Sequence, residues 1–194
     1  MKKYSMYLIR FRVIFLTIIY FASVSPVMTQ QKTQNFISLG TGATIPVQGD
    51  TFKGRYNVGY NVEAKFGLDL GRYYKLRIGF QHSEFSSKDE SSMKLSITNI
   101  GGEFLFNDVF RYNVNMYPKF GAYYYLLNSD DVSENVLGIS AGAGINYSIS
   151  KSKRTFISIE TGFHYFFNTN EVSKKFISDA RMMVPVSAMI TFLL

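Results

Sequence analysis

Charged side chains recur at every second position in several segments of this chain, between bulky apolar residues. In residues 56–71, for example, the even positions are all apolar, and the odd positions include Glu63, Lys65 and Asp69. A period of two puts such residues on one face of an extended strand. Opposite charges gathered on one face can form ion pairs, line a path for ions or take part in proton transfer. The side chains that we expect to share this face are Glu63, Lys65, Asp69, Lys75, Arg77, Lys119, Glu160, His164 and Arg181, and we expect Glu103 to join them beyond a bulge in its strand.

His164 is the member of this set whose ordinary titration range suits acid–base catalysis near neutral pH. It shares its predicted face with Glu160 and Asp179, but no serine is spaced to complete a nucleophilic set. His82 lies far away in the chain, and the sequence has no cysteine, so it predicts neither a metal site nor a thiol nucleophile. The Gly-x-Gly segments do not open a helix, which excludes a dinucleotide site. We therefore expect no enzyme activity and no cofactor.

The sequence predicts that eight β-strands carry these residues. Apolar residues alternate with polar or small ones in each segment, which is typical of strands with one face in an apolar environment. The fourth segment changes phase near Asn99, because Leu95 and Ile97 occupy odd positions whereas Ile100 and Phe104 occupy even ones. One extra residue in a strand produces such a change, so we predict a β-bulge there. The predicted strands are 35–45, 56–71, 74–83, 93–106, 114–126, 137–149, 156–167 and 181–194.

The apolar face of these strands is bulky and aromatic, whereas the polar face carries many glycines and serines beside its charges. Charged residues make up only 18% of the chain, below the quarter that is usual in soluble domains. A barrel of eight strands has room inside only for packed side chains, so small and polar residues suit its interior and large apolar ones suit lipid. The sequence therefore predicts an all-β fold, a closed eight-stranded antiparallel up-and-down transmembrane β-barrel. A soluble lipocalin-like barrel, with the apolar face turned inward, is the main alternative.

The connections between the predicted strands differ in length at the two ends of the barrel. The inner turns are expected at 71–73, 107–113 and 150–154, and the outer loops at 46–55, 84–92, 128–135 and 169–178. Outer loops that are longer on the whole, and aromatic residues near the strand ends, are typical of outer-membrane barrels.

The N-terminal segment has the pattern of a secretory signal peptide. An apolar stretch, residues 13–24, is too short to span about 30 Å of hydrocarbon but suits a signal sequence. We predict a signal peptide at 1–29 and a barrel domain at 30–194, with an uncleaved anchor helix as the alternative. The basic residues before the apolar stretch are Lys2, Lys3, Arg10 and Arg12. Because these supply more than half of the net charge of +7, we expect no nucleic-acid binding.

Several segments follow one another along the chain in an order that resembles a known family. They are Ser38-Leu39-Gly40-Thr41-Gly42-Ala43, Phe120-Gly121-Ala122-Tyr123-Tyr124, Gly142-Ala143-Gly144-Ile145-Asn146-Tyr147, Ile159-Glu160-Thr161-Gly162-Phe163-His164-Tyr165, and a C-terminal strand that ends in apolar residues. In this order the chain resembles the PorT-like outer membrane protein β-barrel family of Bacteroidetes-type bacteria. The resemblance implies a barrel in the bacterial outer membrane. Because many members of that family have no assigned activity and some look like assembly factors for protein secretion, the resemblance implies no particular activity.

Three functions are compatible with these features. The leading hypothesis is a non-enzymatic outer-membrane barrel, expected to be a monomer, with a structural, assembly or partner-binding role and a lumen closed by inward salt bridges. Its partners would be outer-membrane lipid and other envelope or secretion-machinery proteins. The second hypothesis is a narrow channel for ions or small solutes, gated by the same charges. The third, an enzyme that acts on lipid or peptide, lacks a catalytic set in the sequence.

Overall fold

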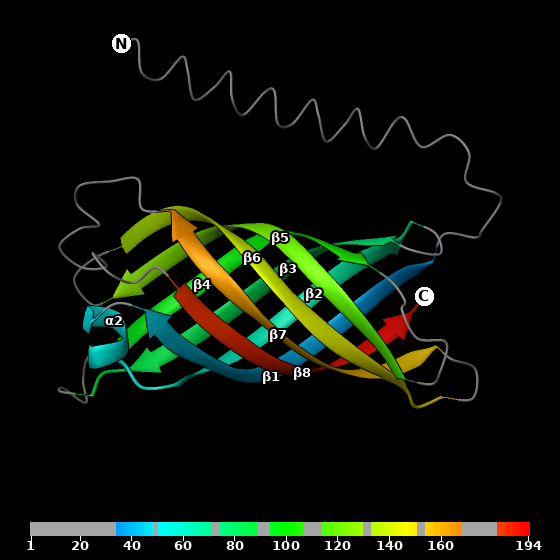
Figure 1. The fold of residues 1–194 in the computed structure, drawn as a ribbon, viewed down its shortest axis with the longest axis horizontal. Coiled ribbons are helices and arrows are strands. Elements are labelled where there is room, and N and C mark those ends of the chain that lie inside the picture. The colour runs from blue at the N-terminus through cyan, green and yellow to red at the C-terminus, as the bar shows by residue number, and fades with distance from the viewer. Residues whose placement is uncertain are drawn as a thin grey trace, which may run out of the picture. The chain divides into compact units, whose positions relative to one another are not determined.

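The computed structural model of this chain is a closed barrel of eight antiparallel strands, shown in Figure 1. It describes residues 34–48, 50–70, 74–88, 94–106, 114–129, 133–150, 154–167 and 182–194. The predicted signal peptide at 1–29, and Arg181 of the predicted charge set, lie outside the described residues. The elements are β1 (Asn35–Gln48), α2 (Asp50–Arg55), β2 (Gly59–Asp69), β3 (Tyr74–Ser86), β4 (Lys94–Phe106), β5 (Val114–Ser129), β6 (Ser133–Ser148), β7 (Thr155–Phe167) and β8 (Met182–Leu193).

Each strand pairs with the next in the chain, and β1 pairs with β8 to close the barrel. The predicted fold class, with its eight strands in up-and-down order, is therefore confirmed. Closure leaves no strand edge with unpaired backbone groups, which is the requirement for a sheet in hydrocarbon. Strand β5 extends beyond its predicted end, β6 begins before its predicted start, and the first predicted loop, 46–55, holds the end of β1 and the short helix α2. No helix in the described ranges is long and apolar enough to cross a membrane.

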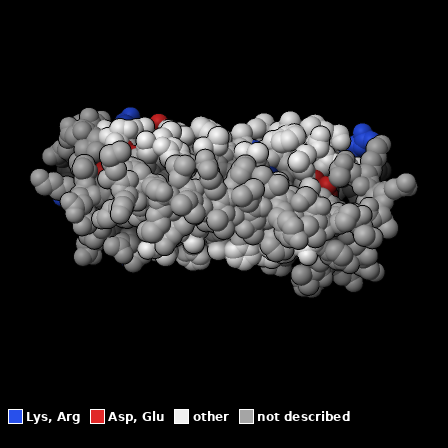
Figure 2. Space-filling model, turned by 90° about the horizontal axis from the view of Figure 1, so that it is seen from above, with Lys and Arg blue, Asp and Glu red and all other residues white. Residues whose placement is uncertain are grey.

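The outer face of the barrel is apolar and the inner face is largely polar. Large apolar side chains such as Ile78 and Ile159 are each 60% exposed, whereas Glu103 and Glu160 are only 1% and 2% exposed. Among the described residues visible in Figure 2, the charged side chains, drawn in blue and red, lie mainly toward the two ends of the barrel. This arrangement is the reverse of a soluble barrel and is that of a transmembrane barrel, whose outer surface contacts lipid.

The predicted bulge near Asn99 is wrong. Strand β4 pairs in unbroken register with β3 and with β5, from Leu95 to Leu105. Leu95 and Ile97 occupy odd positions because they point into the barrel, where they are 4% and 0% exposed. The apparent change of phase arises because the inward-facing residues of this strand are apolar in one part of it and polar in another. The register does shift elsewhere, in β1, between Pro46 and Gln48.

Apolar side chains fill the interior near α2, at the end of the barrel that we call the α2 end. We call this cluster the apolar plug; it consists of Phe52, Phe85, Leu95, Ile97, Tyr123, Tyr125, Leu127, Val136, Phe166 and Met183. Phe52 enters from α2, and its ring packs edge-on against Phe85, with the ring centroids 5.4 Å apart. The expectation of a polar interior therefore holds for only part of the barrel. The opposite end, where β1 begins and β8 ends, is called the terminal end below.

Glycines inside the barrel make room for large rings that cross it. The ring of Tyr117 lies so close to Gly144 that a Cβ atom there would overlap it, and Phe36 occupies the space over Gly67 in the same way. Tyr125 also contacts the position over Gly138, where a Cβ atom would lie 2.8 Å from the ring. Alternate glycines thus supply the space that a narrow barrel otherwise lacks.

Candidate functional site: an ionic layer across the barrel

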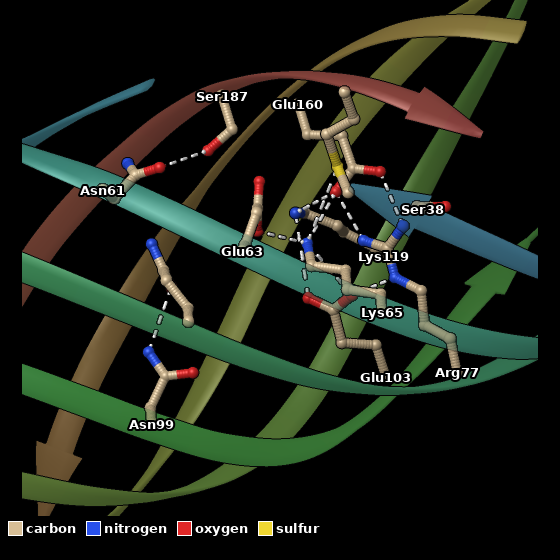
Figure 3. Close-up of polar contacts among 12 residues, drawn as sticks. Ser38, Asn61, Glu63, Lys65, Arg77, Asn99, Glu103, Lys119, Glu160 and Ser187 are labelled. Carbon is tan, nitrogen blue, oxygen red and sulfur yellow. Dashed lines mark hydrogen bonds and ion pairs between the residues drawn. The ribbon is translucent and has the colours of Figure 1, made fainter. Parts of the chain in front are cut away.

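Six charged side chains meet near the middle of the barrel, in what we call the ionic layer. They are Glu63, Lys65, Arg77, Glu103, Lys119 and Glu160, and their exposed fractions all lie at or below 7%. Strands β2, β3, β4, β5 and β7 supply them from inward-facing positions, so the layer spans the barrel from wall to wall. Figure 3 shows these side chains converging from their separate strands.

Glu160 is the centre of the layer. The Arg77 guanidinium donates to both of its carboxylate oxygens, with Nη1 lying 2.6 Å from Oε1. The ammonium of Lys119 lies 2.7 Å from Oε2, and that of Lys65 lies 3.2 Å from the same atom. The hydroxyl of Tyr117 also donates to Oε1. Three cations and a phenol therefore surround one carboxylate.

The other two carboxylates balance the remaining charge. Arg77 donates through Nε to Glu103, whose Oε1 lies 3.7 Å from the Lys119 ammonium. The Lys65 ammonium also forms an ion pair with Glu63, whose Oε2 lies 2.7 Å from it. The layer has as many cations as anions, and this balance is necessary because an uncompensated charge in such a setting costs several kcal/mol. The arrangement holds the strands together and obstructs the lumen.

A layer of neutral polar side chains follows the ionic layer toward the α2 end. Asn61 donates to Thr44 at 3.0 Å and accepts from Ser187 at 3.2 Å. The amide of Asn99 donates to Gln81 at 3.0 Å. Two of these hydrogen bonds join consecutive strands, whereas the bond from Ser187 to Asn61 joins β8 to β2, which are far apart in the sequence.

Two small cavities lie on opposite sides of the ionic layer. The first, of about 10 Å³, is enclosed by the ionic layer, by Gln81 and Asn99 and by His164. The second, of about 80 Å³, lies toward the terminal end beside Phe36, Tyr117 and other residues. A single water needs about 10–15 Å³ by such a measure, so the first cavity holds at most about one. Neither provides a continuous passage through the described part of the barrel.

The structure brings together some of the residues that the sequence grouped and separates others. Asp69 and Lys75 face each other across the β2–β3 hairpin, 3.6 Å apart, at the terminal end and away from the ionic layer. His164 points inward, but it lies beside the apolar plug, where Nδ1 is 2.8 Å from the Tyr125 hydroxyl. Its ring also packs against Tyr123, with centroids 5.1 Å apart.

The sequence did not single out Tyr117, whose hydroxyl donates to Glu160 of the ionic layer. Its position, two residues before Lys119 on the inward face of β5, was the available signal. Within the described ranges, no group of three or more His, Asp or Glu side chains is placed to hold a metal ion. Each carboxylate of the ionic layer already faces cations of the barrel wall. The charges of the layer therefore compensate one another.

Comparisons with known proteins support the fold. No protein-family model matches this chain, and no curated protein sequence matches it. Among solved structures, Neisserial surface protein A is similar with a TM-score of 0.59 and 9% identity, covering 84% of this chain and 99% of that one. A major outer membrane protein from Thermus thermophilus has the same TM-score and 12% identity, covering 82% and 99%. The attachment invasion locus protein Ail of Yersinia pestis, in complex with sucrose octasulfate, has a TM-score of 0.52 and 11% identity, covering 84% and 100%. At these identities the likeness concerns the barrel architecture.

Proposed function

We propose that this chain is a non-enzymatic barrel of the bacterial outer membrane, whose lumen is closed and which serves a structural, assembly or partner-binding role. The terminal end then faces the periplasm, and α2 lies on the outer side. The apolar outer face and the outer-membrane proteins of similar fold support the location. We further propose, from the order of its glycine-rich strand segments, that the chain is related to the PorT-like family.

The filled lumen is the observation that carries this proposal. The ionic layer closes the middle of the barrel, and the apolar plug closes its α2 end. A pathway for hydrated ions would have to open both the ionic layer and the apolar plug. Packed aromatic side chains such as those of the plug stabilise neither water nor a hydrated ion. A barrel closed in this way acts through its surfaces, which it presents to lipid and to other envelope proteins.

A narrow channel is the second candidate function, and one observation favours it. Within the described residues, Glu63 Oε1 and Asn99 Oδ1 are buried without a hydrogen-bond partner, and both residues line the 10 Å³ cavity. Unpartnered buried acceptors attract water or cations. Rearrangement of the ion pairs around this cavity would be the route by which ions pass.

Recording from single proteins in planar lipid bilayers tests the two candidates. The closed-barrel proposal predicts no steady conductance for the purified full chain in neutral-pH buffer. Lys65→Met is the informative variant, because Lys65 contacts both Glu63 and Glu160. Steady conductance that changes in Lys65→Met, but not in the matched variant Lys75→Met at the terminal end, would establish the channel instead.

Partner binding needs a separate experiment, because a barrel that does not conduct ions could have a purely structural role. We expect cross-linking in the native envelope, through lysines such as Lys53 and Lys88 at the α2 end, to yield a defined complex. Both are exposed, and the Lys88 ammonium donates to the Lys53 carbonyl oxygen at 2.7 Å. Recovery of the monomer alone, at every cross-linker length, would leave only the structural role.

A further inference from the structure

The outer face of the barrel is not uniformly apolar. On β5 the outward-facing residues stay apolar from Val114 to Leu126, which spans about 30 Å of membrane for a rise of 3.3 Å per residue and a tilt of about 40°. On β3 the apolar run extends only from Tyr74 to Phe80, or about 15 Å by the same geometry. An outer-membrane barrel needs an apolar band about 25 Å tall. The band therefore ends early on β3.

Strand β4 has the same shortened band, in register with β3. Its outward-facing residues are apolar or glycine from Phe106 up to Ile100 and polar beyond that point. We call the polar area the β3–β4 patch; it consists of His82, Glu84 and Ser86 from β3 and Thr98, Ser96 and Lys94 from β4, which pair directly across the two strands. In the strand register Leu126 of β5 pairs with Thr98 of the patch, and Leu137 of β6, which pairs with Tyr124 of β5, is lipid-facing and 54% exposed.

The side chains of the β3–β4 patch are ordered by contacts with one another. Nδ1 of His82 lies 2.8 Å from the Thr98 hydroxyl, and Nε2 lies 3.4 Å from the Glu84 carboxylate. Tyr60 of β2 pairs with Glu84 in the strand register and leaves 54% of its surface exposed. The patch thus combines hydroxyls, an imidazole, a carboxylate and an ammonium next to an open aromatic ring.

We propose that the β3–β4 patch binds the saccharide headgroup of a glycolipid in the outer leaflet. The occupant must be amphipathic, because the patch continues directly into the lipid-facing residues Phe80 and Ile100. Carboxylate and ammonium groups occur together in the patch, which suits hydroxyl groups better than a cluster of phosphates. The exposed face of Tyr60 can pack against the C–H face of a sugar ring, since the phenol is apolar over its ring and polar at its tip.

A single introduced tryptophan tests the proposal, because the chain has none of its own. The reporter variant is Ser96→Trp, within the patch, and the matched control is Leu137→Trp on β6. Each full-length variant is placed in phosphatidylcholine vesicles, alone or with rough-type lipopolysaccharide, and quenching by acrylamide is measured. We expect the glycolipid to reduce quenching at least twofold for Ser96→Trp and to leave the control unchanged.

A second comparison identifies the source of the protection. Vesicles that contain phosphatidylglycerol supply an anionic phosphate without a sugar and should give no protection. Adding Thr98→Val and Glu84→Leu to the reporter variant should abolish the effect, while migration of the unboiled protein on gels verifies that the barrel has formed. If that combination does not fold, Thr98→Val alone should weaken the protection.

Three results would overturn the proposal: no change with the glycolipid, equal protection by phosphatidylglycerol, or protection that follows protein density in phosphatidylcholine alone. The last would identify a second copy of the chain as the occupant. The outcome is independent of conductance, because the β3–β4 patch lies on the outside of the barrel.

Discussion

The middle of the lumen and its α2 end are closed by opposite means. In the middle, the ionic layer surrounds Glu160 with Arg77, Lys65 and Lys119. At the α2 end, the apolar plug packs rings such as Tyr125 and Phe166, whose centroids lie 4.6 Å apart, as in the core of a soluble protein. The comparison shows that a narrow barrel can be sealed either by compensated charge or by apolar packing. The two seals should respond differently to substitution.

The largest effect is expected from Glu160→Gln. This change keeps the shape of the side chain but leaves the cations of the ionic layer in excess. Removing one partner from a buried charge network costs about 3–5 kcal/mol, and we expect the free energy of unfolding to fall by that amount. Urea unfolding in phospholipid vesicles, followed by gel migration without boiling, measures the loss.

The double variant Arg77→Met, Glu160→Met sharpens the same prediction. It removes one cation and one anion together, so the balance of the layer is kept. Apolar replacement of a whole buried pair is often neutral or stabilising, and we expect the double variant to be more stable than Glu160→Gln. A double variant as unstable as the single one would show that the layer acts through its hydrogen bonds rather than through charge balance.

Next in size is the effect of Phe85→Ala in the apolar plug. Truncating a buried phenylalanine costs about 3–5 kcal/mol, and we expect the lower end because Phe85 lies near the mouth of the barrel under Phe52. The matched control is Phe80→Ala on the outward face of the same strand, where lipid chains can fill the space. Equal losses in the two variants would show that the plug is not packed as a core.

A smaller loss is expected from Gly144→Ala. The new methyl group would overlap the ring of Tyr117 and push its hydroxyl away from Glu160. Overpacking of this kind costs about 1–3 kcal/mol. Gly102→Ala is the control, because the nearest atom to a Cβ there is 3.9 Å away. The same urea unfolding measurement should show little loss for the control.

The smallest effect is expected from Asp69→Asn at the terminal end. Asp69 and Lys75 have side chains that are 23% and 19% exposed, so water screens their attraction. Pairs of this kind contribute about 0–1 kcal/mol, and added salt should reduce even that. The loss caused by Glu160→Gln should be nearly independent of salt, and a clear salt dependence there would contradict the burial of the ionic layer.

Strand alternation made much of the fold predictable from the sequence. Because each side of a strand meets a different environment, residues such as Val62 and Lys65 could be assigned to opposite faces. The short turn after β2 limits the partner of Asp69 to Lys75 or Arg77, because a hairpin turn sets the register, and the structure pairs Asp69 with Lys75. Which charges meet across the lumen could not be foreseen. Glu160 reaches Arg77 from the far wall only because the sheet closes with a particular tilt.

The apolar plug was missed for a physical reason. An alternating pattern separates two faces, but it does not say whether an apolar residue such as Ile97 meets lipid or packs inside. The phase change in β4 therefore has the same sequence pattern as a bulge. The available signal lay across strands: Phe85, Leu127 and Phe166 also occupy positions on the face that was expected to be polar, all at one end of the barrel.

The balanced ionic layer has a consequence for the cell that makes this protein. If the lumen is closed as proposed, a barrel whose middle carries no excess charge would not leak, however many copies are inserted. Such a protein can accumulate without weakening the envelope as a permeability barrier. Its abundance would then be limited by the membrane area that it occupies rather than by loss of solutes through it.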